Sequence, residues 1–258
     1  MQPTTTGENQ TGAAMAEEGV RAMQEANERW APMQPIDTSL ADADRALYIA
    51  QSDALGSIPP PATITGMLKT GFDKLRGERP EVLMDKLGER LAFERSGTRL
   101  YDALIVKYET LAAAGDMPDL SVPLDAGGDD VSSTLLRIRN EEHEHFLMLS
   151  DVMRSLGGDP TAQTPCADAT ATASMGLMQV VTDPRTTLAQ SLNAMLIAEL
   201  ADNAGWELLI SLAEQAGESD VAQQFEQAMA EEDEHLATIK SWVTALATVS
   251  TTTATAAV

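Results

Sequence analysis

The sequence predicts an all-α protein: an antiparallel four-helix bundle with one long crossover between its second and third helices, plus an N-terminal arm. Of all residues 43% are hydrophobic but only 4% are aromatic, and Ala, Leu, Met and Val dominate, a mixture that favours helices packed on helices. Four long segments repeat their apolar residues with the period of a helix. The lengths of the connections between these segments indicate the topology.

Residues 1–80 are predicted to form the arm, partly disordered and with short helices. This region is polar and acidic, with scattered Gly and Pro, so we expect little core of its own. Helical patterns at 17–29 and 40–55 interrupt it. The second pattern runs into three consecutive prolines, 59–61, which must be extended.

Residues 81–248 are predicted to form the bundle, and residues 249–258, a Thr/Ala run, a flexible tail. Helix start and stop signals bound four segments, 81–113, 132–156, 184–216 and 221–248. The third and fourth are joined by only a few residues and are therefore expected to be antiparallel neighbours. The connection from Gly157 to Asp183 is long enough to return along the bundle, with a small helix expected at 175–181.

Composition and charge exclude several functional classes. The formal charge is −23, from 40 acidic and 17 basic residues, so the chain lacks the cations that a phosphate backbone requires, and we expect no nucleic-acid partner. The acidity either concentrates cations or simply keeps the surface soluble. A single cysteine, Cys166, excludes an intramolecular disulfide. Neither a signal peptide nor a membrane-length apolar run is present, which predicts a cytoplasmic protein without membrane contact.

The three histidines fall in two similar motifs, Glu-Glu-His-Glu-His at 141–145 and Glu-Glu-Asp-Glu-His at 231–235. Both contain Glu-x-x-His, whose two side chains lie about 60° apart on one helix face and so reach a common point. At about 100° per residue, both pairs lie on the apolar stripe of their helix. One such match arises by chance in roughly one chain in four of this composition, but two do so far less often. The paired residues are Glu142 with His145 and Glu232 with His235.

The other two long segments each carry one acidic residue at the centre of the apolar stripe, Glu94 in the first and Glu199 in the third. Four carboxylates buried without compensation would each cost several kcal/mol and repel one another. Two divalent cations would balance four glutamates. Mixed carboxylate and imidazole ligands suit iron best, with manganese or zinc possible. The sequence therefore predicts a two-metal site.

The order Glu, Glu-x-x-His, Glu, Glu-x-x-His over residues 81–248 resembles the ferritin-like di-iron carboxylate superfamily, which includes bacterioferritins and rubrerythrins. The segment Leu-Ala-Phe-Glu-Arg-Ser-Gly-Thr-Arg-Leu-Tyr-Asp-Ala-Leu at 91–104 is similar to an uncharacterised bacterial ferritin-like branch. The resemblance implies that Glu142 and Glu232 bridge the metals. It also implies that Glu94, Glu199, His145 and His235 are terminal ligands.

Three neighbouring residues have weaker assignments. Asp202, about 60° from Glu199, would accept the second N–H of a ligand histidine or make an ordinary polar core contact. Tyr101 would be a redox-active or hydrogen-bonding phenol near the metals, or a packed core tyrosine. Gly97 would leave space beside the site or allow close helix approach.

The leading functional prediction is redox chemistry of Fe(II) with O₂ or peroxide, of the ferroxidase or peroxidase type. The alternatives are oxidation or oxygenation of a small organic substrate and non-catalytic metal sequestration. Storage in a ferritin cage is not expected, because the arm would obstruct the cage-building surface. No Cys-x-x-Cys module is present to deliver electrons as in rubrerythrin. An exposed apolar helix face and the arm predict a homodimer.

Overall fold

The computed structural model describes residues 16–32, 34, 37–52, 55–56, 58–59, 80–115 and 130–255. The chain divides into two units, residues 1–53 and 54–258. The first contains α1 (Glu17–Trp30) and α2 (Ser39–Gln51), and neither helix buries a side chain. Both helices lie where the sequence predicts short helices. The predicted disorder at 1–15 and 60–79 falls outside the described residues, and the boundary of the arm at residue 80 stays a prediction.

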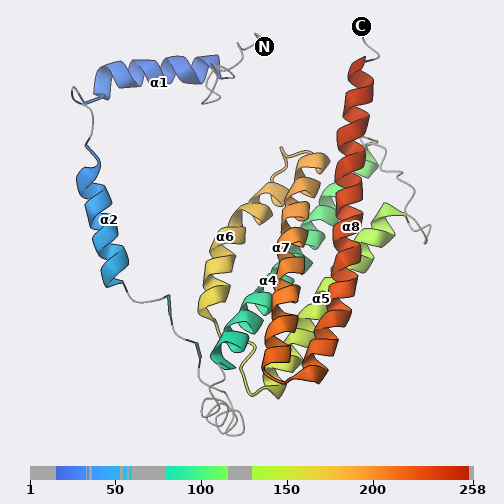
Figure 1. The fold of residues 1–258 in the computed structure, drawn as a ribbon. Coiled ribbons are helices and arrows are strands. Elements are labelled where there is room, and N and C mark those ends of the chain that lie inside the picture. Colours follow the sequence, from blue (N-terminus) through green and yellow to red (C-terminus); the bar gives the residue numbers. More distant parts are fainter. Residues whose placement is uncertain are drawn as a thin grey trace. The chain divides into compact units, whose positions relative to one another are not determined.

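The second unit is a bundle of long helices, drawn from green to red in Figure 1. Its elements are α4 (Pro80–Ala114), α5 (Val131–Ser155), α6 (Pro165–Thr182), α7 (Leu188–Gln215) and α8 (Ser219–Thr255). Helices α4 and α5 pack together, as do α7 and α8, and contacts of α4 with α7 and of α5 with α8 close the bundle. Within the described residues every regular element is a helix, which confirms the all-α fold class.

The helix ends follow from local chemistry. The Asp130 side chain accepts a hydrogen bond from the backbone N–H of Ser133 and caps α5, and Thr187 and Gln190 form a reciprocal capping box on α7. Helices α5 and α7 stop at Gly157 and Gly217, which have φ of 85° and 72°. A glycine reverses the chain there because a side chain disfavours positive φ.

The crossover contains more helix than the sequence predicts. Instead of a small helix at 175–181, α6 spans Pro165–Thr182 and packs against α4 and α7. Thr164 caps it, and its first turn is fixed to α4 because the backbone N–H of Cys166 donates to the Asp85 carboxylate at 2.9 Å. Helix α8 also continues to Thr255, beyond the predicted end at Thr248.

The core consists of two apolar clusters with a polar layer between them. One cluster contains Leu104 of α4 and Trp242 of α8, and the other contains Leu87 of α4 and Phe225 of α8. Along the chain, α4 and α8 run from the second cluster to the first, whereas α5 and α7 run the opposite way. Neighbouring helices are therefore antiparallel, and the parallel pair α5 and α7 needs the returning crossover that α6 provides. Among the described helices, none is both long and apolar enough to cross a membrane.

Candidate metal centre

All six predicted ligands lie in the polar layer, where the bundle brings the midpoints of four helices together. Each is at most 3% exposed: Glu94, Glu142, His145, Glu199, Glu232 and His235. Helix α4 contributes Glu94 and α7 contributes Glu199, while α5 and α8 contribute one Glu-x-x-His pair each. The apolar stripe of each helix carries its ligands inward, because the flanking leucines and tryptophans bury the same face.

Potential ligand atoms gather in three overlapping groups among the described residues, each with its atoms within 4.8 Å of one another. One group contains His235 with Glu142, Glu199 and Glu232, and another contains His145 with Glu94 and Glu232. A further group joins Glu94, Glu142, Asp202 and Glu232. Glu232 belongs to all three groups, and Glu142 to two, so these carboxylates lie between the two histidines.

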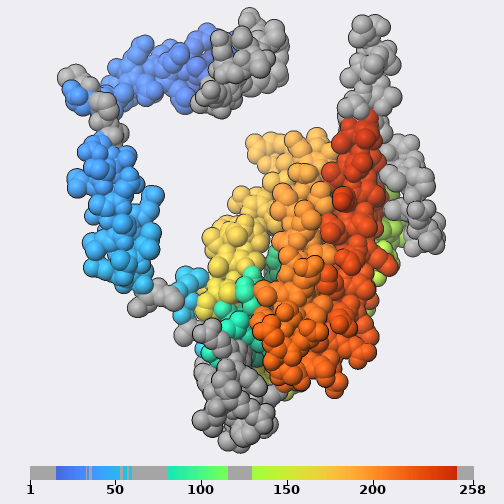
Figure 2. Space-filling view, viewed as in Figure 1, coloured from blue at the N-terminus to red at the C-terminus, as the bar shows by residue number. Residues whose placement is uncertain are grey.

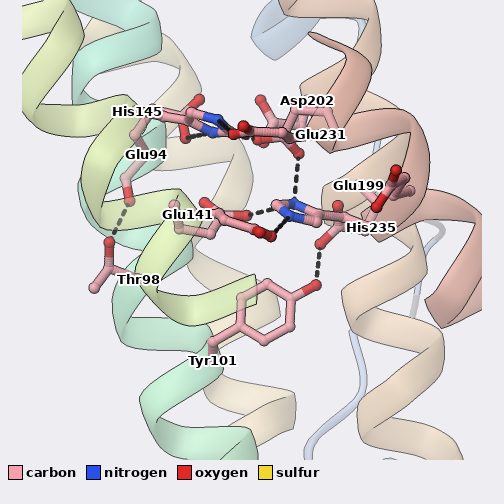
Figure 3. A network of polar contacts seen from close by, with 12 residues as sticks. Glu94, Thr98, Tyr101, Glu141, His145, Glu199, Asp202, Glu231 and His235 are labelled. Atoms are coloured by element: carbon pink, nitrogen blue, oxygen red, sulfur yellow. Dashed lines mark hydrogen bonds and ion pairs between the residues drawn. The ribbon is translucent and has the colours of Figure 1, made fainter. Parts of the chain in front are cut away.

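The two histidines enter the layer from α5 and α8, and each has one ring nitrogen paired with a glutamate carboxylate of the opposite helix (Figure 3). Nδ1 of His145 lies 2.7 Å from Oε1 of Glu232, and Nδ1 of His235 lies 3.1 Å from Oε2 of the same carboxylate. The Nε2 atoms point to carboxylates on the opposite helix, at 2.8 Å from Glu231 for His145 and at 2.8 Å from Glu141 for His235. A carboxylate that accepts the Nε2–H leaves the Nδ1 lone pair free toward the centre of the layer.

Of the two roles considered for Asp202, acceptor for a ligand histidine or polar core contact, its contacts fit the second. Oδ1 of Asp202 lies 2.5 Å from Nη1 of Arg90, whose Nε is 3.2 Å from Oε1 of Glu94. The outer nitrogens of the histidines are instead held by Glu141 and Glu231, the first residue of each Glu-Glu doublet. Asp202 thus pairs with a buried cation, because rotation of α7 turns it toward α4.

Sequence reasoning missed three residues of this layer, Glu141, Glu231 and Arg90. The signal for the first two was the doublet itself, which begins both histidine motifs. The signal for Arg90 was its position four residues before Glu94, which places a cation on an apolar stripe. It is 5% exposed, and its guanidinium lies over the Phe93 ring at 4.1 Å from the centroid.

Three further features of α4 and α7 fix the layer. The Tyr101 hydroxyl, fully buried, donates to Oε1 of Glu199 at 2.5 Å (Figure 3). A Cβ on Gly97 would clash with the carboxylate of Glu142, so this glycine makes room for a candidate ligand. The Asn203 amide donates to the backbone carbonyls of Glu199 and Glu232, which joins α7 to α8 at this level.

The layer carries too much negative charge for a dry interior. Burial, reinforced by neighbouring carboxylates, raises the pKa of Glu94 and Glu142 well above the ordinary range, that of Glu199 to about 8 and that of Asp202 to about 7. Burial alone would also raise the pKa of Glu232, but hydrogen bonds from the two histidines outweigh it and lower that pKa to about 2.

For the two histidines, burial and hydrogen bonding shift the pKa in opposite directions, and hydrogen bonding has the larger effect. Burial would lower the pKa of His235, but hydrogen bonds to Glu141 and Glu232 outweigh it and raise this pKa to about 10. The pKa of His145 is raised for the same reason by Glu232 and Glu231. Protons on both imidazoles thus replace part of the missing positive charge.

Divalent cations fit this donor set. With all five buried carboxylates ionised and both imidazoles neutral, the forms that metal ligation requires, the four glutamates and Asp202 exceed the one buried arginine by four negative charges. Several oxygens lack any hydrogen-bond partner within the described residues, including Oε2 of Glu94, Glu142 and Glu199. Buried oxygens in this state are suited to coordinate cations, and two divalent ions would balance the excess.

Part of the chain matches a known protein family. Residues 124–249 match the family model of the ferritin-like domain, a range that includes α5 to α7, α8 as far as residue 249, and every candidate ligand except Glu94. Searches of curated proteins and of solved structures return no significant match. The helical bundle and the buried carboxylate and imidazole layer agree with this similarity of residues 124–249 to the ferritin-like domain.

Proposed function

We propose that the bundle holds a pair of metal ions, iron in the native protein, and carries out redox chemistry with Fe(II) and O₂ or peroxide. One observation carries the proposal: a buried layer with five carboxylates, one arginine and unpartnered oxygens, in which each of two imidazoles directs Nδ1 inward. Manganese and zinc suit the same donors less specifically. The choice of iron rests on the mixed carboxylate and imidazole ligands.

In this proposal Glu142 and Glu232 would contribute to both metal positions. Glu94 and Nδ1 of His145 would complete one position, and Glu199 and Nδ1 of His235 would complete the other. The overlapping groups of ligand atoms support this division. A pair of Fe(II) ions bound there would supply two electrons to an oxidant, one from each ion.

Residues around the ligands orient the donors and exclude water. Glu141 and Glu231 hold the Nε2–H of the two histidines, which fixes their tautomer. Tyr101 holds Glu199 through its hydroxyl, and its own pKa is raised well above 10 by burial and by the nearby Glu199 carboxylate, so it stays protonated. The two apolar clusters close the layer above and below.

The test is oxidation of added Fe(II), with Fe(II) treated as substrate as well as occupant. We expect two Fe(II) per chain to bind without oxygen, and ferric absorbance to develop rapidly when O₂ or peroxide is added. Glu142→Gln should abolish both. Glu144→Gln is the matched control, because Glu144 lies on the same helix but is exposed. Tight binding with no accelerated oxidation would refute the redox role and favour sequestration.

Oxidation of a small organic substrate is the second candidate, and a pocket beside the layer supports it. The pocket has a volume of about 250 Å³, is mostly apolar, and has Arg90 in its lining. Oxygen consumption that rises with an added organic compound, in the absence of excess Fe(II), would favour this function over ferroxidase activity.

We also propose a homodimer formed through the outer face of α7. Ile197 and Leu200 are exposed on this helix. Between 188 and 206 the charged residues are Glu199 and Asp202, both buried, and the exposed Glu207 ends this uncharged stretch. On a chain of charge −23, an uncharged face is where two copies approach with least repulsion. Sedimentation should show a dimer that Leu200→Glu dissociates, and a monomeric wild-type protein would contradict the proposal.

A further inference from the structure

The structure contains a small pocket between α4, α6 and α7, separated from the metal layer by one side chain. Figure 2 shows the atoms of α6, in yellow, beside those of α7, in orange. We call it the α6 pocket and define it by the lining residues that matter here: Arg90, Phe93, Ala173, Ser174, Gly205 and Leu208. Its volume of about 250 Å³ equals roughly eight waters at about 30 Å³ each. It therefore suits a compact molecule.

Arg90 gives this pocket a fixed donor. The guanidinium is held between the Phe93 ring and Gly205, since a Cβ at Gly205 would clash with Nη1. Nη1 contacts both Oδ1 and the backbone oxygen of Asp202, at 2.5 and 2.9 Å, and Nε faces Glu94. Nη2, which carries two N–H groups, makes no hydrogen bond within the described part of the chain.

The other polar groups of the lining are mostly paired with one another. Nζ of Lys86 lies 2.5 Å from one oxygen of Glu89, and the Thr170 hydroxyl donates to the other oxygen at 2.6 Å. Ser174 makes no side-chain hydrogen bond to the described residues. The free groups are thus donors, Nη2 of Arg90 and the Ser174 hydroxyl, beside apolar walls. An occupant that presents an acceptor oxygen satisfies them.

The charge balance decides between a neutral and an anionic occupant. The guanidinium already faces two carboxylates, those of Asp202 and Glu94. A ligand carboxylate would place a third negative charge against one buried cation, whereas a carbonyl oxygen adds none. We propose that the α6 pocket binds a small uncharged molecule whose carbonyl oxygen accepts from Nη2 of Arg90 and whose apolar body packs on Phe93 and Leu208.

The test uses isobutyramide, a compact neutral amide, and isobutyrate, its anionic isostere. Titration followed by amide NMR should give saturable shifts at Ser174 and Gly205 with isobutyramide, and at least tenfold weaker binding of isobutyrate. Ala173→Phe fills the pocket and should weaken isobutyramide binding at least tenfold. Ala169→Phe on the same helix is the matched control, because Ala169 is exposed and outside the lining, and it should bind as wild type.

Ser174→Ala provides a second variant that barely changes volume. Loss of one hydrogen bond there should weaken isobutyramide binding by about two- to tenfold. Absence of saturable shifts in the wild type would overturn the proposal. So would equal affinity in a folded Ala173→Phe protein, or tighter binding of isobutyrate. All titrations are run on metal-free and metal-loaded protein, so failure here is distinguishable from failure to bind metal.

Discussion

Removing either outer carboxylate should weaken one metal position more than the other. Glu141→Gln replaces the acceptor for Nε2–H of His235 by an uncharged amide, and Glu231→Gln does the same for His145. Neither residue is a proposed ligand, and neither is fully buried, so both variants should fold. The contacts cross between α5 and α8, so each substitution acts on the histidine of the opposite helix.

The expected size follows from distance and burial. Both contacts are 2.8 Å, but Glu141 is 21% exposed and Glu231 is 50% exposed. Loss of such an outer partner typically lowers metal affinity by about 10- to 100-fold, or about 1.4 to 2.7 kcal/mol. The drier Glu141 contact is screened less by water, so Glu141→Gln should approach the upper value and Glu231→Gln the lower.

Anaerobic Fe(II) titration against a competing chelator measures both effects. The wild type should bind two ions, and each variant should keep one binding step near wild-type strength while the other step weakens. Glu144→Gln should leave both steps unchanged. Wild-type affinity for both ions in both variants would refute the role of the outer carboxylates. A larger loss of Fe(II) affinity in Glu231→Gln than in Glu141→Gln would refute the effect of burial.

Three other perturbations test the same layer. The metal-free protein should melt at least about 4 °C lower at pH 8.5 than at pH 5.5, equivalent to roughly 1 to 2 kcal/mol. The reason is that folding raises the pKa of Glu199 to about 8 and of His235 to about 10, so stability falls as pH rises through 4.5 to 10. A melting temperature that is the same or higher at pH 8.5 than at pH 5.5 would contradict this expectation. Gly97→Ala should lower metal affinity at least tenfold, because the added Cβ displaces the buried carboxylate of Glu142. Gly176→Ala is the control: its Cβ would lie in open space, so metal binding should be unchanged and the free energy of unfolding should rise by about 0.5 to 1 kcal/mol. Tyr101→Phe should keep the fold but weaken metal binding by about 0.5 to 1.5 kcal/mol through the lost hydrogen bond to Glu199, and unchanged binding in the titration would refute that role.

The sequence was sufficient for the bundle and for the inward direction of the candidate ligands. The helical period of the apolar residues predicts which side chains are buried. A residue on the apolar stripe of a long helix faces the core, whichever helices pack against it. This is why Glu94 and Glu199 were recognised as single acidic residues among leucines. Connection length likewise indicated that the second and third bundle helices run parallel.

Partner choice inside the layer was not predictable in the same way. Asp202 lies on the correct stripe, but the contact it makes depends on how α7 is rotated against α4 and on Arg90, a residue distant in sequence. The crossing contacts of Glu141 and Glu231 likewise require knowledge of how α5 faces α8. A helical wheel gives the direction of each side chain around its own helix axis. It does not give the rotation of one helix against another, which decides these contacts.

The length of α6 was underestimated for a different reason. Its sequence from 165 to 182 is rich in Thr and Ala and lacks a strong apolar stripe, so periodicity gave little signal. The stabilising contacts are tertiary, from Asp85 and Glu89 of α4 to the first turns of α6. Thr164 followed by Pro165 was nevertheless a readable start signal, because proline favours the first turn of a helix.

The most direct test of the central claim is anomalous diffraction from crystals of the protein grown with Fe(II) under anaerobic conditions. We expect two iron peaks within the buried layer, both in contact with Glu142 and Glu232, with one beside Nδ1 of each histidine. A single peak, or iron only at the acidic surface, would contradict it.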